Sequence, residues 1–280
     1  MPKLFFASAI LAYLLLSFAA PAQEPVLAPE PQGAIATLKQ KAESGDARAE
    51  VKLGVAYASG DGAPADAQEA VRWFQKAADQ GDAAGEYSLS ELYLTGRGVN
   101  ADFTQGLKWL RKSAEHGDPR GEFNLAALYE QGQGVPKDEK EAAKWARRAA
   151  DQGLAAGQFA LGSMYAHGRG VPQSEAEAAV WYGRAADQGD APSMNNLAVL
   201  LSTSSDGKLR NPNEAILFAL KAVAAEPDNP AYLDTLATTY YEAGQPDKAV
   251  EAERRALALS PEKASYKQAL EKYEAAGAKH

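Results

Sequence analysis

Residues 82–117, DAAGEYSLSELYLTGRGVNADFTQGLKWLRKSAEHG, decide the fold of this chain. Asp82 is a typical helix N-cap, because its carboxylate can accept hydrogen bonds from the free N–H groups of a first helical turn. Apolar residues follow at helical spacing as far as Gly96, which can end a helix in the left-handed conformation. Asp102 repeats the capping signal before a second apolar pattern that ends at Gly117. The stretch therefore predicts two helices joined by a GRGV turn.

The same pattern returns every 36 residues along the chain. All four tryptophans of the protein fall in one column of this repeat, and tyrosine, leucine and glycine form further columns. A fixed period of this length indicates a repeat architecture, and the large residues of its columns are expected to pack between helices. The columns are Trp73, Trp109, Trp145 and Trp181; Tyr57, Tyr93, Tyr129 and Tyr165; Leu53, Leu89, Leu125 and Leu161; and Gly81, Gly117, Gly153 and Gly189.

The unit resembles the Sel-one-like repeat (SLR), a 36-residue branch of the tetratricopeptide-repeat (TPR) superfamily, of the exported bacterial type. The resemblance is carried by AEVKLGVAY at 49–57, GDGA at 60–63 and AVRWFQKAA at 70–78. It implies an all-α fold, a right-handed α-solenoid of helix-turn-helix repeats, with the first helix of each unit on a concave surface. GRGV is then an interhelical turn, and it does not continue into the G-x-x-x-x-G-K-[ST] pattern of a phosphate-binding loop.

The repeat divides the chain into segments. Four SLR units are expected over residues 46–189, followed by a divergent fifth unit at 190–226 that contains the longer loop Ser202–Asn213. The period then becomes 34, and residues 227–262 look like an ordinary TPR unit. We expect an N-terminal capping helix at 34–45, and a C-terminal capping helix with a tail at 263–280. Whether the longer loop binds anything stays open.

Residues 1–22 have the pattern of a secretory signal peptide. Lys3 precedes an apolar run from Leu4 to Ala20, and small residues around Ala22 predict cleavage after it. An uncleaved membrane anchor is the alternative, although the run is shorter than the ~20 residues that cross a bilayer. Residues 23–33 contain several prolines and are expected to form an extended linker. The mature protein is therefore expected to be periplasmic or secreted, without stable membrane insertion.

Composition argues against several classes of function. The protein contains no cysteine, which excludes disulfides, thiolate metal sites and a catalytic thiol. Its net charge of −8 argues against binding to a nucleic acid backbone. Of the three histidines, His167 follows Ser163 by one helical turn, but no orienting carboxylate stands at a matched position. We therefore predict no catalytic residue, no metal ligand set and no cofactor.

The resemblance places partner binding on the concave face formed by the first helices. Aromatic side chains with polar groups between them are what a peptide groove requires. The aromatic column could equally belong to the core of each hairpin, and the sequence leaves both possibilities open. The predicted partner-binding residues are Tyr87, Glu91, Arg120, Phe123, Glu130, Phe159, His167 and Asn195.

The sequence thus predicts an exported, non-enzymatic scaffold or adaptor that holds a protein or peptide segment. Regulation of a membrane sensor or an envelope complex is a role that the resemblance suggests for it. The alternative is a cell-wall or β-lactam-related binder or hydrolase, because a cysteine-rich branch of the family is associated with penicillin binding. The absence of cysteine weakens that alternative.

Overall fold

A computed structural model describes residues 32–278 of the chain. These residues form fourteen α-helices and no β-strand, which confirms the predicted all-α solenoid class. The signal peptide, its cleavage site after Ala22 and most of the proline-rich linker lie outside the described residues. The first described helix begins at Gln32, so it takes in the end of the segment that was expected to be extended.

The helices divide into two compact units, residues 1–152 and 153–280, and each unit is described by itself. The first unit contains α2 (Gln32–Glu43), α3 (Ala47–Ser59), α4 (Ala67–Asp79), α5 (Ala83–Thr95), α6 (Phe103–Glu115), α7 (Pro119–Gln131) and α8 (Glu139–Asp151). The second contains α9 (Ala155–His167), α10 (Glu175–Asp187), α11 (Ala191–Thr203), α12 (Pro212–Ala225), α13 (Pro230–Glu242), α14 (Pro246–Leu259) and α15 (Ala264–Gly277).

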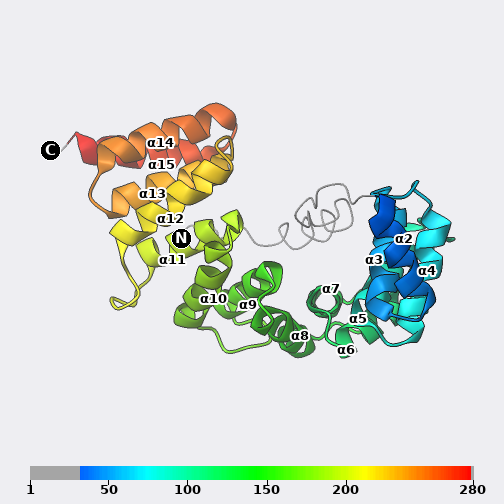
Figure 1. Ribbon diagram of the computed structural model, residues 1–280. Helices are drawn as coiled ribbons and strands as arrows, with labels where there is room; N and C mark the ends of the chain where they lie inside the picture. Colours follow the sequence, from blue (N-terminus) through cyan, green and yellow to red (C-terminus); the bar gives the residue numbers. More distant parts are fainter. Residues whose placement is uncertain (1–31, 279–280) are drawn as a thin grey trace. The chain divides into compact units, whose positions relative to one another are not determined.

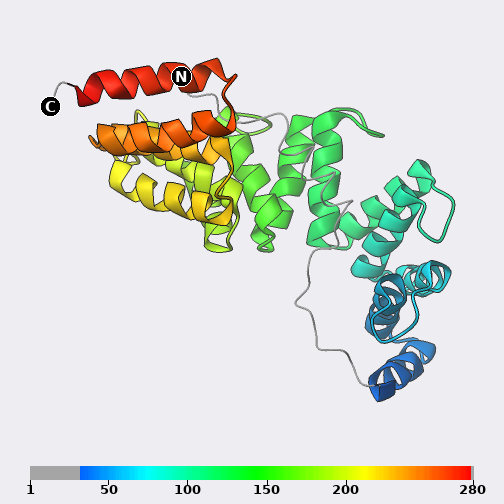
Figure 2. The ribbon, with the colours of Figure 1, turned by 90° about the horizontal axis from the view of Figure 1, so that it is seen from above.

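Within each unit, a helix packs mainly against the helices that precede and follow it in the chain. Figure 1 shows this for α13, α14 and α15, which lie side by side at the C-terminal end. In Figure 2, α15 runs along α14 as the last layer of the second unit. Contacts between sequence neighbours are what a repeat solenoid consists of.

The ends of the helices are fixed by the residues that the sequence indicated. The Asp82 carboxylate accepts a hydrogen bond from the Gly85 N–H at the start of α5, and Asp102 accepts one from the Gln105 N–H at the start of α6. Gly96 ends α5 with a left-handed φ of 71°. These local signals confirm the predicted hairpin.

The G-x-G turn, GRGV between α5 and α6, is a structural element of the first four hairpins. The Asp102 N–H donates to the Tyr93 carbonyl over 2.9 Å and so closes the turn between α5 and α6. Gly98 has a φ of 72°, and a Cβ atom there would lie only 2.2 Å from the carbonyl oxygen of Ala67 in the preceding repeat. The turn thus packs against the N-terminus of α4, and glycine is required for this approach. The closing bond recurs in three other repeats, from Asp66 to Tyr57, from Asp138 to Tyr129 and from Ser174 to Tyr165.

The leucine and tryptophan columns form the packing between helices, as expected. All four column leucines are buried, and so are Trp73, Trp109 and Trp181, whereas Trp145 is half-buried. A basic side chain lies over each indole ring, an arrangement that cation–π attraction favours. The pairs are Lys76 over Trp73 at 3.9 Å, Lys112 over Trp109 at 4.3 Å, Arg148 over Trp145 at 4.6 Å and Arg184 over Trp181 at 4.4 Å.

Candidate functional site

The predicted binding residues lie on first helices of their repeats, and we call the surface made by these helices the first-helix surface. In the first unit it is formed by α3, α5 and α7, and in the second by α9, α11 and α13. The predicted residues are therefore shared between two units. The first unit holds Tyr87, Glu91, Arg120, Phe123 and Glu130, and the second holds Phe159, His167 and Asn195.

Three of the predicted residues of the first unit come together in one cluster. The Tyr87 hydroxyl donates a hydrogen bond to Oε1 of Glu91 over 3.0 Å, one turn further along α5. The Arg120 guanidinium of α7 lies over the Tyr87 ring, with Cζ 4.4 Å from the ring centroid. The cluster therefore joins α5 to α7 through an acid, a phenol and a guanidinium.

Two residues that the binding-site prediction missed complete this cluster. Asp118, the N-cap of α7, accepts two hydrogen bonds from the Arg120 guanidinium, to Oδ2 over 2.7 Å and to Oδ1 over 3.1 Å. Asn124 donates from Nδ2 to the Tyr87 hydroxyl over 3.4 Å. Asp118 was recognisable as a capping residue from the sequence. Its hydrogen bonds with the Arg120 guanidinium were not, because they depend on the conformation of the Arg120 side chain. Asn124 had a weaker signal, since it shares a repeat column with Asn196.

The surroundings of the cluster shift the pKa of two of its residues. Burial raises the pKa of Glu91, against the opposing effects of the Tyr87 hydrogen bond and of the Arg120 charge. Burial also raises the pKa of Tyr87, and the Glu91 carboxylate adds to this shift, so the phenol remains a hydrogen-bond donor at neutral pH. Because the Asp118 carboxylate holds Arg120, the guanidinium keeps a fixed position with 40% of its side chain exposed.

The aromatic column is buried in the described structure. Tyr87, Phe123 and Phe159 are each 5% exposed, and the Phe159 ring lies 5.9 Å from the ring of Tyr182, between centroids. This burial supports the possibility that these rings belong to the hairpin cores. Of the predicted residues of the first unit, Glu91, Arg120 and Glu130 remain partly accessible.

The predicted residues of the second unit are arranged differently. Nδ1 of His167 lies 2.7 Å from the backbone carbonyl of Ser163, while Arg169 donates to the Ser163 hydroxyl over 2.7 Å. A nucleophile–base pair instead needs a ring nitrogen that accepts the hydroxyl proton. Asn195 of α11 is 7% exposed, and its buried side-chain oxygen has no hydrogen-bond partner among the described residues.

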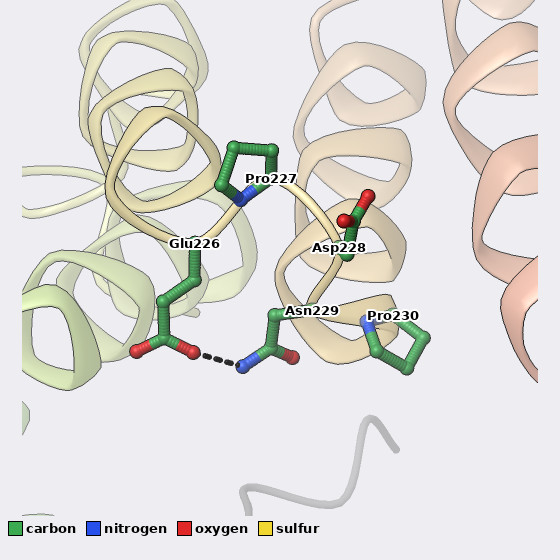
Figure 3. Close-up of a pocket in the computed structure, with 5 residues that line it drawn as sticks. All are labelled: Glu226, Pro227, Asp228, Asn229 and Pro230. Carbon is green, nitrogen blue, oxygen red and sulfur yellow. Dashed lines mark hydrogen bonds between the residues drawn. The ribbon is translucent and has the colours of Figure 1, made fainter.

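No metal site occurs among the described residues, and the pocket at the loop between α12 and α13 is shallow. Residues 32–278 hold no group of three or more histidine, aspartate or glutamate side chains that could bind a metal ion. A shallow hollow lies at the loop between α12 and α13, lined by residues 226–230 (Figure 3). Two of its polar side chains bind each other, since Asn229 donates from Nδ2 to the Glu226 carboxylate over 2.9 Å. Among the described helices, none is long and apolar enough to cross a membrane.

Comparison with known proteins identifies the repeats. The Sel1 repeat matches five consecutive segments, at residues 47–82, 83–118, 119–154, 155–190 and 191–226. A solved structure of a Sel1 repeat protein from Oxalobacter formigenes is 26% identical to the chain, with a TM-score of 0.66, and the match covers 89% of this chain and 97% of that one.

A second solved structure is a protective antigen present in uropathogenic Escherichia coli strains, which displays an SLR fold. It is 29% identical, with a TM-score of 0.54 over 81% of this chain, and the match spans 56% of the length of that protein. The search of curated proteins gave no match. Because the five matched segments extend from residue 47 to residue 226, well over half of the sequence, the chain belongs to the Sel1 repeat family.

Proposed function

We propose that this protein is an exported, non-enzymatic scaffold that binds a protein segment on its first-helix surface. The Sel1 repeat fold is typical of protein–protein interaction scaffolds, which present one surface many times with different side chains. The observation that carries the proposal is the cluster of Tyr87, Glu91 and Arg120. It offers a partly accessible carboxylate and a pre-positioned guanidinium on two adjacent repeats.

The physical reason to expect binding at this cluster is its preorganisation. A guanidinium that is already held by Asp118 and by the Tyr87 ring loses little conformational freedom when a partner contacts it. Its remaining N–H groups can donate to a backbone carbonyl or a carboxylate of a bound segment. The Glu91 carboxylate, on α5 of the preceding repeat, can accept a hydrogen bond from a backbone N–H or a lysine of the same segment.

Affinity capture tests this proposal. Residues 23–280 would serve as bait in an extract of exported proteins, beside a bait carrying Glu91→Gln and Arg120→Gln, which retain volume but lose charge. A control bait would carry Glu251→Gln and Arg255→Gln, two exposed positions on the second helix α14. Loss of a captured protein from the cluster variant alone supports the proposal. Equal capture by all three baits contradicts it.

Export is a separate part of the proposal, and it rests on the N-terminal sequence alone. Cleavage after Ala22 would release a chain that begins at Gln23. Mass spectrometry of the protein recovered from an expressing bacterium would identify this N-terminus. An intact N-terminus that includes Lys3 would contradict cleavage and favour an anchored chain. Regulation of a membrane sensor or an envelope complex is the role in which we would place the scaffold.

The absence of an enzymatic role can be tested on the same preparation. Hydrolysis of a chromogenic β-lactam by the purified protein would favour the cell-wall alternative over the scaffold. If the protein is a scaffold, Arg120→Gln should abolish partner capture, and neither the natural chain nor the variant should hydrolyse the β-lactam.

A further inference from the structure

The second helices of the first unit carry rows of basic side chains on their outer side. The row that comprises Lys76, Lys112 and Arg148 has a structural role, because each of its members lies over the tryptophan of its own helix. The second unit keeps this row, with Arg184 over Trp181 and Lys221 over Phe218. The fold therefore uses a cation at this column in all five repeats.

Two further rows carry basic residues in the first three Sel1 repeats but are uncharged in the fourth and fifth. The column of Arg72, Lys108 and Lys144 continues in the second unit as Val180 and Leu217. The column of Gln75, Arg111 and Arg147 continues as Gly183 and Leu220. Val180, Leu217 and Leu220 are all substantially exposed, so the fold accepts uncharged side chains at these positions. The additional cations of the first unit thus need an explanation other than the stability of the solenoid.

We call these five additional cations the outer basic patch: Arg72, Lys108, Arg111, Lys144 and Arg147. They lie on three second helices, and the Arg148 side chain of α8 donates to the Ala114 carbonyl of α6 over 3.1 Å. At the α4 end, Gly81 lies beside the His116 ring that follows α6. The patch thus lies on three consecutive second helices of the first unit, which approach one another near their C-terminal ends.

The charge of the patch is least compensated at its centre. Arg72 of α4 and Lys144 of α8 each form an ion pair with a glutamate three residues earlier on the same helix. On α6 the corresponding position is Gln105, so Lys108 has no such acid. Nζ of Lys108 lies 5.7 Å from the centroid of the Trp109 ring. Arg111 makes no ion pair with any described residue.

A row of acidic residues limits the size of an anion that the patch can accept. Asp79, Glu115 and Asp151 end the same three helices, one turn beyond the patch, and the whole chain has a net charge of −8. A long polyanion such as duplex DNA would extend from the patch over these carboxylates and be repelled. A short acidic segment can neutralise the exposed cations without reaching the acidic row.

We propose that the outer basic patch is a second interaction surface, which binds a short acidic segment of a partner protein. The interaction is independent of the first-helix surface, because the patch lies on the second helices. Two partners, or two segments of one partner, could then be held by the same repeats. Lys108 and Arg111 are its central contacts, because their charges are the least compensated.

Fluorescence anisotropy on the purified full chain tests this proposal. The probe is a short labelled peptide of alternating aspartate and glutamate, and its reference is the same peptide with asparagine and glutamine. The patch variant carries Lys108→Glu and Arg111→Glu. The control variant carries Lys208→Glu and Arg255→Glu, which change the net charge equally at exposed positions of the second unit. Far-UV circular dichroism would verify that both variants remain folded.

We expect the acidic peptide to bind the natural chain, with an affinity that falls as salt is added. The patch variant should bind about tenfold more weakly or worse, and the control variant within about twofold of the natural chain. A variant with Glu91→Gln and Arg120→Gln should bind the peptide normally, which separates this result from the proposed function. Equal weakening in patch and control variants would overturn the proposal, as would absence of peptide binding. Tighter binding of duplex DNA or of anionic lipid vesicles than of the peptide would also overturn it.

Discussion

Glu253 of α14 is completely buried, and its carboxyl group interacts with that of Asp234 on α13. Burial, reinforced by the Asp234 carboxylate, raises the pKa of Glu253 to about 8, and burial also raises the pKa of Asp234. The Lys263 charge opposes both shifts without cancelling them. The folded chain therefore binds more protons than the unfolded chain between the ordinary glutamate pKa of 4.5 and this raised value.

The free energy of unfolding should therefore decrease as the pH rises. The stabilisation that comes from protonated Glu253 is complete below the pKa of the unfolded chain and is lost as the pH rises through the pKa of the folded chain. The free energy of unfolding should therefore fall by at least ~1 kcal/mol between about pH 5 and about pH 8. Urea unfolding followed by circular dichroism measures this decline. Glu253→Gln has the same shape but does not titrate, and it should flatten the profile. An equally steep decline in the variant would show that other groups are responsible.

Gly98 and Gly117 are both glycines with positive φ, at 72° and 93°, but their surroundings differ. A Cβ atom on Gly98 would lie 2.2 Å from the Ala67 carbonyl oxygen, whereas one on Gly117 would have no atom within 4 Å. Gly117→Ala should therefore destabilise the chain by only about 1 kcal/mol, from its backbone conformation. Gly98→Ala adds a displacement of the turn from α4 and should be clearly worse, by about 2 kcal/mol or more. Thermal unfolding of the two variants provides the comparison, and equal losses would contradict the packing role of the GRGV turn.

At the scale of elements, a polar pair with one buried member joins the first helix to the end of the second helix in each of the first four repeats. Four such pairs recur along the chain, each joining residues 30 apart, and the first-helix member is buried in every one. They are Gln80 with Glu50 at 2.6 Å, His116 with Glu86 at 2.8 Å, Gln152 with Glu122 at 2.7 Å and Gln188 with Gln158 at 2.8 Å. His116 is the exception in a column of glutamines.

This exception gives a matched pair of variants. His116→Gln introduces the residue of the other repeats and can still donate to Glu86, so stability should change by less than about 0.5 kcal/mol at neutral pH. His116→Leu leaves the buried Glu86 carboxylate without this donor and should destabilise the chain by about 1–3 kcal/mol. Chemical denaturation monitored by tryptophan fluorescence is suitable, because Trp109 lies in the same hairpin. If both variants lost the same amount, the hydrogen bond would not be the cause.

These pairs also show what the sequence could and could not predict. The helix ends were predictable, since the Asp82 cap and the Gly96 stop act on backbone groups within a few residues. The pairing of His116 with Glu86 was not predictable, because the two residues become neighbours only after both helices of the repeat have packed. The burial of Phe123 and Phe159 was undecided for the same reason. The contact between Arg120 and Asp118 depends on a side-chain conformation that no periodic pattern encodes.

At the scale of the whole molecule, stability should behave as a sum of local terms, because each helix packs mainly against its neighbours in the chain. The C-terminal end offers a test of this behaviour. Tyr273 of α15 is 3% exposed, its ring lies 4.9 Å from that of Tyr241, between centroids, and its hydroxyl is 3.1 Å from Oγ1 of Thr238. This tyrosine therefore holds the capping helix against α13.

Tyr273→Ala removes this contact and should destabilise the last helices by about 3–5 kcal/mol. Hydrogen exchange measured by mass spectrometry should then become faster in α13, α14 and α15 but stay unchanged in α3–α8, because α15 packs mainly against α14, its neighbour in the chain. Tyr273→Phe, which loses only the hydroxyl, should have an effect of about 1 kcal/mol in the same segments. Faster exchange throughout residues 32–278 would mean that the solenoid opens as one cooperative body, and the additive description would then fail.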